Sequence, residues 1–490
     1  MANPLYKEFD LVIIGGGIVG TWVAKKALKH NLRIAVVEIG PASSINLPDS
    51  KPAIKFNERV NMGANEARNQ VLTGNSKYWG GGLISNNANS LMNILGLNNQ
   101  DKIVNEILSE YENVQKELNV GNIIREDISQ LTGNETKLAS VQVLSGKKRH
   151  LWRNFYKNNS SNELLNIFTK ANIIDIQVTN DKVEYLKLLL TSNEIILIKS
   201  NCYLLSAGVI DSNLFVQKYF NENISYNYNG LGKGLHDHWS INIAKVIWNK
   251  DTFFSTLYPL KFVKGKIIGK RIELVSKYDN KTKGFLHLQA NYDEIEPYNS
   301  IKSLLFNFDK SLISIIKVII HLLKYFPQLI KIGWFRYAKK ELYISKGTVI
   351  NLVLDFESVS DELNKIKYSN SKADLNWNVR ENDINNFLDF YFQAKNIFDN
   401  VIENKQMLYF VSNNKTELKK YFCENVIDAY HLGGGIPISK YVNYNFTFSN
   451  LNNFYILGTA IFNRPGIANP VLTLLALGNI FIKNITSNKN

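Results

Sequence analysis

Three glycines and one acidic residue near the N-terminus have the types and spacing needed to bind a dinucleotide. The glycines form the pattern Gly15-x-Gly17-x-x-Gly20, and Glu38 follows it. Gly15 permits a tight turn, Gly17 lets the backbone approach a pyrophosphate, and Gly20 lets a helix pack closely on a strand. The Glu38 carboxylate can accept hydrogen bonds from ribose hydroxyls. These residues predict a dinucleotide site, although the pattern alone leaves both FAD and NAD open.

The residues around this pattern predict the strand–turn–helix–strand unit that such a site requires. The apolar runs Leu11–Ile14 and Ile34–Val37 have the composition of strands buried on both faces. The segment between them would place apolar residues on one side of a helix and lysines on the other. Another apolar run, starting at Cys202, ends in Ala207 and Gly208, where a further strand would meet the nucleotide. A Rossmann-like α/β fold is therefore expected.

A glycine-rich stretch, GNSKYWGGG at residues 74–82, predicts a loop rather than a helix. Gly74, Gly80 and Gly81 permit close approach to a flat ligand, with Trp79 buried beside it. The alternative is a turn around a core tryptophan, and the stretch taken alone favours that alternative.

Three further stretches carry residues that could do chemistry. His431 stands before three glycines, and Asn469 and Pro470 open the last expected helix, where they fit the N-cap and first helical positions. Taken alone, His431 is more typical of a hydrogen-bonded histidine in a turn. The His-Asp-His sequence at 236–238 offers metal ligands, but its spacing lacks a convincing third partner. We therefore expect no metal site.

The composition narrows the class of protein. The 490 residues are 45% hydrophobic, which allows a large core, and 57 basic against 43 acidic residues give a net charge of +14. The basic residues are spread along the chain, so nucleic-acid binding is not expected, whereas attraction to an anionic substrate or a membrane face stays open. Two cysteines, Cys202 and Cys423, and no signal-like start predict a reduced, cytoplasmic setting. No uncharged apolar run is long enough to span a membrane.

The middle of the chain changes character near residue 240. Residues 241–300 alternate between apolar and polar positions, which predicts an antiparallel sheet with one covered face. Residues 310–335 predict a helix divided by Pro327, with one narrow polar stripe on an otherwise apolar surface. The stripe comprises Lys310, Ser314, Lys317, His321, Lys324, Gln328 and Lys331. We favour a helix buried against the second domain; the alternative is a helix that rests on a membrane or caps the site.

Five sequence blocks together resemble the glucose–methanol–choline (GMC) family of FAD-dependent oxidoreductases, with the closest likeness to its bacterial and pyranose-oxidase-like branch. The blocks are IIGGGIVG with VVEIG; GNSKYWGGG; LLSAGVIDSNLF; GLGKGLHDHW; and YHLGGG with NNFYILGTAIFNRPGIANPVLTLLALGNIF. They occur in the family's order along nearly the whole chain. The resemblance implies FAD rather than NAD, and oxidation of an alcohol, such as a sugar or polyol, by hydride transfer to flavin N5.

The resemblance also implies roles for individual residues. The catalytic base of the family is the histidine of an H-x-x-G block, which is His431 here. Its second polar residue precedes a proline at the start of the last helix, which is Asn469 here. The chain departs from the family at 435–437, where threonine and arginine are usual. The branch's flavin-linked histidine is replaced by Tyr78, so non-covalent FAD is expected.

The implied organisation is a discontinuous FAD-binding domain, residues 1–96, 160–240 and 425–490, and a substrate domain, residues 97–159 and 241–424, built on a largely antiparallel sheet. The residues expected at the cofactor are Gly15, Gly17, Gly20, Glu38, Gly74, Asn75, Trp79, Gly80, Gly81, Ala207, Gly208, Gly458, Thr459, Asn469 and Pro470.

The expected partners are a small-molecule alcohol and an electron acceptor, which is oxygen, a quinone or a carrier protein. Peripheral membrane contact through residues 310–335 stays open. Two alternatives also stay open: the same fold acting on a lipid or lipid-linked alcohol at a membrane surface, and a non-oxidative flavoprotein of the lyase or decarboxylase type.

Overall fold

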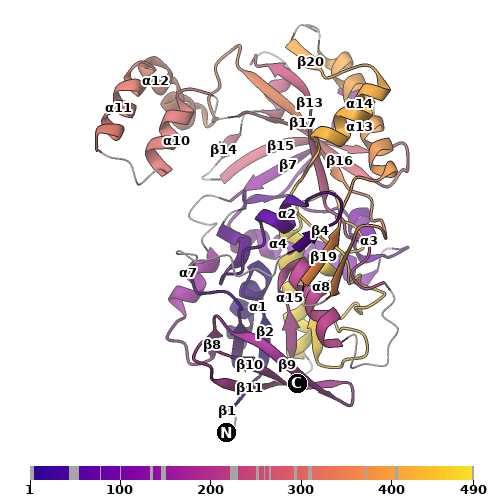
Figure 1. Ribbon diagram of the computed structural model, residues 1–490. Helices are drawn as coiled ribbons and strands as arrows, with labels where there is room; N and C mark the ends of the chain where they lie inside the picture. Colours follow the sequence, from indigo (N-terminus) through magenta and orange to yellow (C-terminus); the bar gives the residue numbers. More distant parts are fainter. Residues whose placement is uncertain are drawn as a thin grey trace.

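The computed structural model has two main parts and a helical arm that stands apart from them (Figure 1). Both chain termini lie at the lower end of the view, and the arm projects at the upper left. The structure describes residues 5–43, 54–77, 79–99, 101–132, 136–144, 151–220, 230–249, 253–258, 260–263, 266–291, 295–306, 312–369, 372–402 and 407–487.

The centre of the lower part is a five-stranded parallel sheet in the order β22-β12-β2-β3-β8. Its strands are β22 (Phe454–Ile456), β12 (Tyr203–Leu205), β2 (Leu11–Ile14), β3 (Ile34–Val37) and β8 (Leu165–Phe168). Every residue of β2 and β3 is buried, as apolar parallel strands covered on both faces must be. The predicted strands and the helix between them, α1 (Ile18–Leu28), are confirmed.

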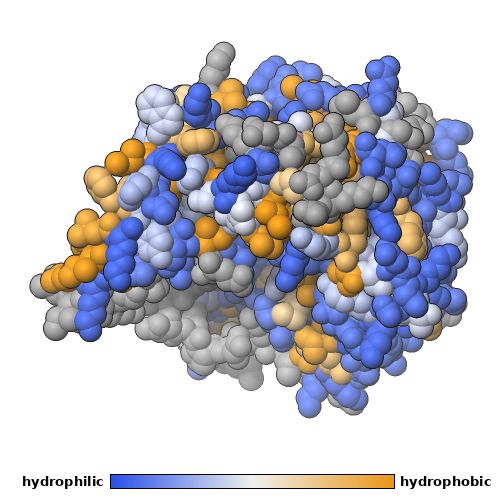
Figure 2. Space-filling model, turned by 90° about the horizontal axis from the view of Figure 1, so that it is seen from above, coloured by the Kyte–Doolittle hydropathy of each residue, from blue (hydrophilic) through white to orange (hydrophobic). Residues whose placement is uncertain are grey.

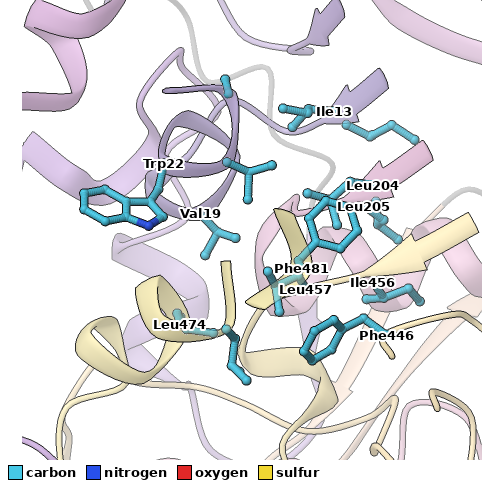
Figure 3. Packing of buried hydrophobic residues seen from close by; sticks show 14 of the residues in the cluster. Ile13, Val19, Trp22, Leu204, Leu205, Phe446, Ile456, Leu457, Leu474 and Phe481 are labelled. Atoms are coloured by element: carbon cyan, nitrogen blue, oxygen red, sulfur yellow. The ribbon is translucent and has the colours of Figure 1, made fainter. Parts of the chain in front are cut away.

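Helices pack beside this sheet and form the first hydrophobic core. They include α1, α4 (Lys102–Leu118) and the C-terminal α15 (Val471–Ser487). Figure 3 shows Val19 and Trp22 of α1 near Leu474 of α15. The Trp22 indole N–H also donates to the Asn479 side-chain oxygen at 2.9 Å, so a polar contact fixes how the two helices meet.

Helix α4 belongs to this first core, since its buried face packs against α15. The predicted boundary at residue 97 therefore does not separate the two cores. The sequence of this segment does not indicate which part of the molecule covers its apolar face.

A four-stranded sheet lies below the parallel sheet in Figure 1. Its order is β1 (Leu5–Phe9), β11 (Ile195–Ser200), β10 (Lys182–Leu189) and β9 (Asn172–Thr179). β1 pairs with β11 in parallel, and the other pairs are antiparallel.

The upper part is built on a ten-stranded sheet in which all pairs are antiparallel. Its strands are β5 (Gly82–Leu83), β6 (Arg125–Asp127), β7 (Lys137–Val143), β13 (His238–Ile247), β14 (Lys261–Val263), β15 (Lys266–Val275), β16 (Lys283–Gln289), β17 (Val349–Glu357), β20 (Leu408–Phe410) and β21 (Ile427–Asp428). Helices α13 (Glu381–Val401) and α14 (Lys415–Asn425) share the second hydrophobic core with this sheet. The antiparallel sheet predicted for residues 241–300 is confirmed.

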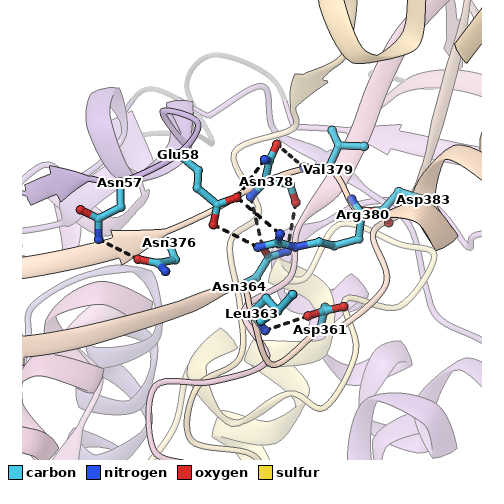
Figure 4. A network of polar contacts seen from close by, with 10 residues as sticks. All are labelled: Asn57, Glu58, Asp361, Leu363, Asn364, Asn376, Asn378, Val379, Arg380 and Asp383. Atoms are coloured by element: carbon cyan, nitrogen blue, oxygen red, sulfur yellow. Dashed lines mark hydrogen bonds and ion pairs between the residues drawn. The ribbon is translucent and has the colours of Figure 1, made fainter. Parts of the chain in front are cut away.

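A small sheet and a polar network connect the early chain to the segment before α13. β4 (Ile54–Phe56) pairs with β19 (Lys372–Asn376), which pairs with β18 (Lys365–Ser369). Next to it, the Glu58 carboxylate accepts hydrogen bonds from Arg380 at 3.4 Å and from Asn378 at 2.9 Å (Figure 4). The Arg380 guanidinium also donates to the Asn364 side-chain oxygen.

The remaining elements are shorter or lie in the arm. They are α2 (Met62–Glu66), α3 (Ala88–Leu95), α5 (Ser129–Thr132), α7 (Leu151–Asn158), α8 (Gly208–Phe220), α9 (Phe254–Leu257), α10 (Tyr298–Phe306), α11 (Leu312–Leu323) and α12 (Phe326–Trp334), with single turns η1 (Gly74–Lys77), η2 (Phe335–Lys339) and η4 (Thr459–Ile461).

The helical arm, defined here as residues 312–340, is where the structure departs most from expectation. Pro327 lies in the first turn of α12 and divides the helix from α11, as predicted. None of residues 315–340 is buried, however, so the favoured interpretation of a helix buried against the second domain is wrong. A helix with the length and apolar content needed to cross a bilayer is absent from the described part of the chain.

Candidate active site

A cavity of about 1000 Å³ lies between the parallel sheet and the upper part of the molecule. Its wall is assembled from segments far apart in sequence. They include the turn after β2, the end of β3, parts of residues 63–75, residues 79–82, the β12–α8 turn, residues 429–432, and the segments that precede η4 and α15. The carboxyl ends of parallel strands therefore open into it, which is where α/β sheets bind ligands.

Glycine keeps the backbone of this wall accessible. A Cβ placed on Gly17, Gly80, Gly208 or Gly458 would meet no atom of the described residues within 4 Å, apart from the chain neighbours, although all four residues line the cavity. Side chains there would therefore fill space that a ligand could use. Backbone N–H groups at such positions, together with the N-terminus of α1, fit an anionic pyrophosphate.

Two other predicted glycines have packing roles. A Cβ on Gly20 would lie 2.1 Å from the Gly15 carbonyl oxygen, and Gly20 does not line the cavity. Gly15 has φ +99°, and a Cβ there would lie 2.7 Å from the Ser206 carbonyl oxygen. Close packing of α1 and β12 on the turn therefore requires both glycines.

Glu38 holds the dinucleotide-type turn in place. One carboxylate oxygen accepts from the Gly16 backbone N–H at 3.0 Å, and the other accepts from the Gly40 backbone N–H at 2.9 Å. The side chain lines the cavity at the end of β3 and is only 6% exposed. Burial raises the pKa of Glu38, against the opposing effect of these backbone donors. Each oxygen retains a lone pair for a ribose hydroxyl.

His431 reaches the cavity on a backbone fixed by a buried carboxylate. The Asp237 Oδ1 accepts from the backbone N–H of His431 at 2.9 Å and from that of His238 at 2.7 Å. The preceding residue, Tyr430, has φ +61°, so the chain turns sharply before the histidine. The Asp237 contact was missed by sequence reasoning, because Asp237 was considered only as a metal ligand.

The surroundings of the His431 ring favour its neutral form. Its Nδ1 is buried and has no hydrogen-bond partner among the described residues. The His238 ring lies edge-on at 5.3 Å between centroids. Burial, followed by the nearby His238, lowers the pKa of His431 to about 3. An imidazole in this environment is uncharged at neutral pH and can accept a proton.

Asn469 lines the same cavity from the start of α15. Its side-chain amide donates to the Gly82 carbonyl oxygen at 3.3 Å, which links the last helix to the glycine-rich loop. Pro470 directly precedes α15, which begins at Val471, so the helix starts one residue later than the sequence predicted. The fold thus brings His431 and Asn469 to one wall.

The glycine-rich loop also lies at the cavity. Gly74, Asn75, Trp79, Gly80 and Gly81 line it. Trp79 is half-buried rather than buried, and its ring contacts Trp152 edge-on, with centroids 6.0 Å apart. Its indole nitrogen is buried without a hydrogen-bond partner in the described structure, which leaves a donor for a ligand. Tyr78, on which the non-covalent prediction depends, lies outside the described residues.

The remaining predicted residues, Ala207, Gly208, Gly458 and Thr459, also line the cavity. All of the predicted site residues except Gly20 therefore lie at one cavity. Arg68 and Asp211, which form an ion pair at its rim, were not predicted, since isolated charged residues carry no sequence pattern.

A candidate cation site lies beside His431, where no metal site was expected from the sequence. Ligand atoms of Asp237, His238 and His431 lie within 4.8 Å of one another. His431 supplies the third partner that residues 236–238 lacked, while the His236 ring faces the Phe462 carbonyl oxygen at 3.0 Å instead. Protein contacts account for much of this cluster, because Asp237 Oδ1 accepts two backbone N–H groups and His238 Nε2 contacts the Gly466 carbonyl oxygen at 2.5 Å.

A half-buried ion network on the upper sheet influences the same histidines. Asp355 on β17 contacts Arg271 on β15 and His287 on β16, each at 2.9 Å. Burial alone would raise the pKa of Asp355, but His287 and Arg271 hold it well below its usual range. The charges of Asp355 and Arg271 act with opposite sign on the pKa of His431. Strand alternation predicted the sheet but not this pairing across three strands.

A family model matches the C-terminal part of the chain. Residues 361–478 match the family model described as GMC oxidoreductase. A search of curated proteins found no match.

Solved structures share the fold along the full chain. A pyridoxine 4-oxidase from Mesorbium loti matches with a TM-score of 0.61 and 11% identity, covering 97% of this chain and 98% of that one. A formate oxidase matches with a TM-score of 0.59 and 12% identity over 99% of both chains. An Aspergillus oryzae RIB40 formate oxidase variant, solved to study FAD modification in that enzyme, matches with a TM-score of 0.58 and 11% identity over 98% of both chains. Residues 361–478 thus match the GMC oxidoreductase family, and the whole chain shares its fold with the pyridoxine and formate oxidases.

Proposed function

We propose that this oxidoreductase oxidises the CH–OH group of an alcohol in the cavity, with FAD as cofactor and His431 as the base. One observation carries the proposal. His431 and Asn469 come from separate segments, yet both line the cavity that is bordered by the dinucleotide-type turn at Gly15 and Gly17. A base, a polar group and a nucleotide-binding turn therefore share one site.

The state of His431 supports its role as base. The lowered pKa keeps the imidazole neutral at pH 7, so a ring nitrogen has a lone pair that can accept a hydrogen bond from the substrate hydroxyl. The hydrogen bond from the His431 backbone N–H to Asp237 fixes the backbone position from which the imidazole extends. His431 takes the hydroxyl proton as the carbinol hydride leaves, so the product forms as a neutral carbonyl rather than as a protonated, positively charged one.

Asn469 supports the same reaction by positioning. An amide N–H can donate to the substrate oxygen without competing for its proton. One of its N–H groups contacts the Gly82 carbonyl oxygen, and the other remains for a ligand. Holding the substrate oxygen between Asn469 and His431 would orient the C–H bond and reduce the entropic barrier.

The residues at the cavity fit FAD. The backbone of Gly15 and Gly17 would hold the pyrophosphate, Glu38 the ribose, and Trp79 would lie near the loop that borders the remaining space. FAD, when bound, supplies the two-electron acceptor of the reaction at its N5 atom. We propose that it is held without a covalent bond, since Tyr78 stands where the related branch has a histidine; flavin that stays with the acid-precipitated protein would contradict this.

The substrate is a sugar or polyol in the first version of this proposal. A second version is favoured by the exposed helical arm: a lipid or lipid-linked alcohol at a membrane surface. The electron acceptor in either version is oxygen, a quinone or a carrier protein. A lyase- or decarboxylase-type reaction is the non-oxidative alternative, and it would leave flavin oxidised in the presence of alcohols.

The test is an anaerobic absorbance spectrum of the purified protein with a panel of sugars, polyols and lipophilic alcohols. We expect a flavin spectrum that bleaches with at least one of them. The His431→Ala variant should retain flavin but be reduced about 10²- to 10⁴-fold more slowly, the usual contribution of a general base.

His321→Ala is the matched control, because His321 lies on the helical arm rather than at the cavity. It should be reduced by a soluble alcohol at the wild-type rate. A wild-type flavin that no alcohol reduces would contradict alcohol oxidation. Wild-type reduction rates in His431→Ala would retain the reaction but remove His431 as its base.

A further inference from the structure

We propose that the helical arm, residues 312–340, docks on the surface of an anionic lipid bilayer. The inference rests on three observations about the arm itself: an exposed apolar face, exposed aromatic side chains along α12 and just after it, and charges of one sign. It does not depend on the proposed activity.

The first observation is a continuous apolar face on α11. Ile316, Ile319, Ile320 and Leu323 follow the spacing i, i+3, i+4 and i+7, so they lie on one side of the helix. They are 47–62% exposed. The residues on the other side, Ile315, Val318 and Leu322, are only half exposed. The more exposed side of α11 is therefore apolar, whereas the solvent-facing side of a surface helix is usually polar.

The apolar face continues past Pro327 and becomes aromatic. Phe326, Ile330 and Trp334 are spaced by four residues along α12 and are 57–60% exposed, and Tyr337 beyond them is 75% exposed. Figure 2 shows apolar side chains gathered along the outer edge of the arm, at the left of the view. Tryptophan and tyrosine favour the boundary between lipid headgroups and acyl chains.

The charge of the arm has one sign. Residues 315–340 contain no aspartate or glutamate, and their basic residues are Lys317, Lys324, Lys331, Arg336, Lys339 and Lys340. All six are exposed. Lys317 and Lys324 lie seven residues apart, beside the apolar face rather than opposite it. Basic side chains next to an apolar face complement the phosphates of an anionic leaflet.

The charge pattern favours a bilayer over a second copy of this chain. Two arms packed face to face would bring their lysine rows together without any acidic partner from the arms. The arm also fits a surface position rather than a spanning one. The twelve residues of α11 are about 18 Å long, well short of the roughly 30 Å hydrocarbon core.

The firm attachment of the arm's C-terminal end suits this role. The Arg336 guanidinium lies 3.6 Å from the centre of the Phe262 ring of β14. Lys261 on the same strand faces Glu341 at 3.9 Å. These two contacts fix the arm to the upper sheet. An arm bound to a bilayer would therefore hold the rest of the protein at a fixed distance from the lipid.

The test is flotation of the full-length flavoprotein with vesicles of phosphatidylcholine alone or of phosphatidylcholine and phosphatidylglycerol in a 70:30 ratio, at low salt. We expect the protein to float with the anionic vesicles and to dissociate as salt is raised, because the attraction is partly electrostatic. Lys317→Glu/Lys324→Glu and Ile320→Ser/Leu323→Ser should each lower the bound fraction about tenfold or more.

Lys116→Glu/Lys419→Glu is the matched control, because it makes the same charge change on exposed residues of α4 and α14. It should float like the wild type. Melting temperature and flavin content confirm that each variant is folded; both arm variants change exposed residues, so folding should be unaffected.

Three results would overturn the proposal: no flotation of the wild type with anionic vesicles, equal flotation of the wild type and both arm variants, or equal loss of flotation in the control. Light scattering during size-exclusion chromatography addresses the competing partner. A dimer that dissociates in Ile320→Ser/Leu323→Ser, together with no vesicle binding, would assign the arm to contact between copies of the chain.

Discussion

The cavity and the helical arm use their side chains in opposite ways. At the cavity, buried polar groups such as Glu38 and Asp237 are bonded to backbone N–H groups, and glycines keep the wall open. On the arm, apolar side chains such as Leu323 and Trp334 are about 60% exposed. The cavity wall is therefore stabilised by contacts within the protein. The exposed apolar area of the arm can be buried only by a partner outside the chain.

Glycine shows the same contrast at the level of single atoms. Gly20 in α1 and Gly333 in α12 are both helical glycines. A Cβ on Gly20 would lie 2.1 Å from the Gly15 carbonyl oxygen, while a Cβ on Gly333 would meet no atom within 4 Å. The first glycine is required by packing, and the second is not.

The largest predicted effect comes from Gly20→Ala. The added methyl group would force α1 away from the turn, so we expect a loss of about 3 kcal/mol or more of unfolding free energy, together with the bound flavin. Urea unfolding and the absorbance of the purified protein measure both losses.

Gly333→Ala is the control for this comparison. It should leave flavin content unchanged and raise helix stability by about 0.5–1 kcal/mol at most, the usual gain over glycine in a helix. Equal stability of the two variants would show that close packing of the turn on α1 is not what holds the cavity wall.

A smaller effect is predicted for Gly17→Ala, which separates ligand binding from folding. Gly17 has φ −69°, which alanine adopts freely, and its Cβ would meet no protein atom. The flavin-free protein should therefore change by less than about 1 kcal/mol. The methyl group would occupy space next to the predicted pyrophosphate, so the flavin dissociation constant should rise about tenfold or more. Flavin titration of the stripped protein measures it; an unchanged constant would place the pyrophosphate elsewhere.

The same contrast explains what the sequence could predict. The turn of Gly15, Gly17 and Gly20 and the apolar runs on either side of it are local, so one stretch of sequence predicted the strands and the helix around the turn. The convergence of His431 and Asn469 came from family resemblance rather than from spacing, since neither residue has a local pattern. The bond from His431 to Asp237 joins residues 194 positions apart and leaves no trace in either segment.

The arm could be predicted only as far as its periodicity reached. The polar stripe and Pro327 indicated two helical pieces correctly. Periodicity states which residues share a face, but it does not state what covers that face. Burial of the arm depends on which strands pack against it, and neither β14 nor β17 holds it against the second hydrophobic core. The sequence of the segment therefore could not decide between a buried and an exposed helix.

The smallest predicted effect concerns the pH dependence of stability, and it tests whether the cavity wall excludes charge in the way its geometry implies. The folded protein lowers the pKa of His431 to about 3, against an ordinary value near 6.5, so the unfolded chain binds more protons between these values. Stability should therefore fall as pH drops below about 6.5. Buried acids such as Asp237 and Glu38, whose pKa values are raised, act in the opposite direction over part of this range. The total change with pH thus mixes opposing contributions, and only a difference between variants isolates the histidine.

His431→Asn removes the titrating group while keeping a polar side chain at the cavity. Urea unfolding at pH 7.5 and pH 5.5 should show that the wild type loses about 1 kcal/mol more than this variant between the two values. Equal losses would mean that the His431 ring is as well solvated in the folded protein as in the unfolded chain.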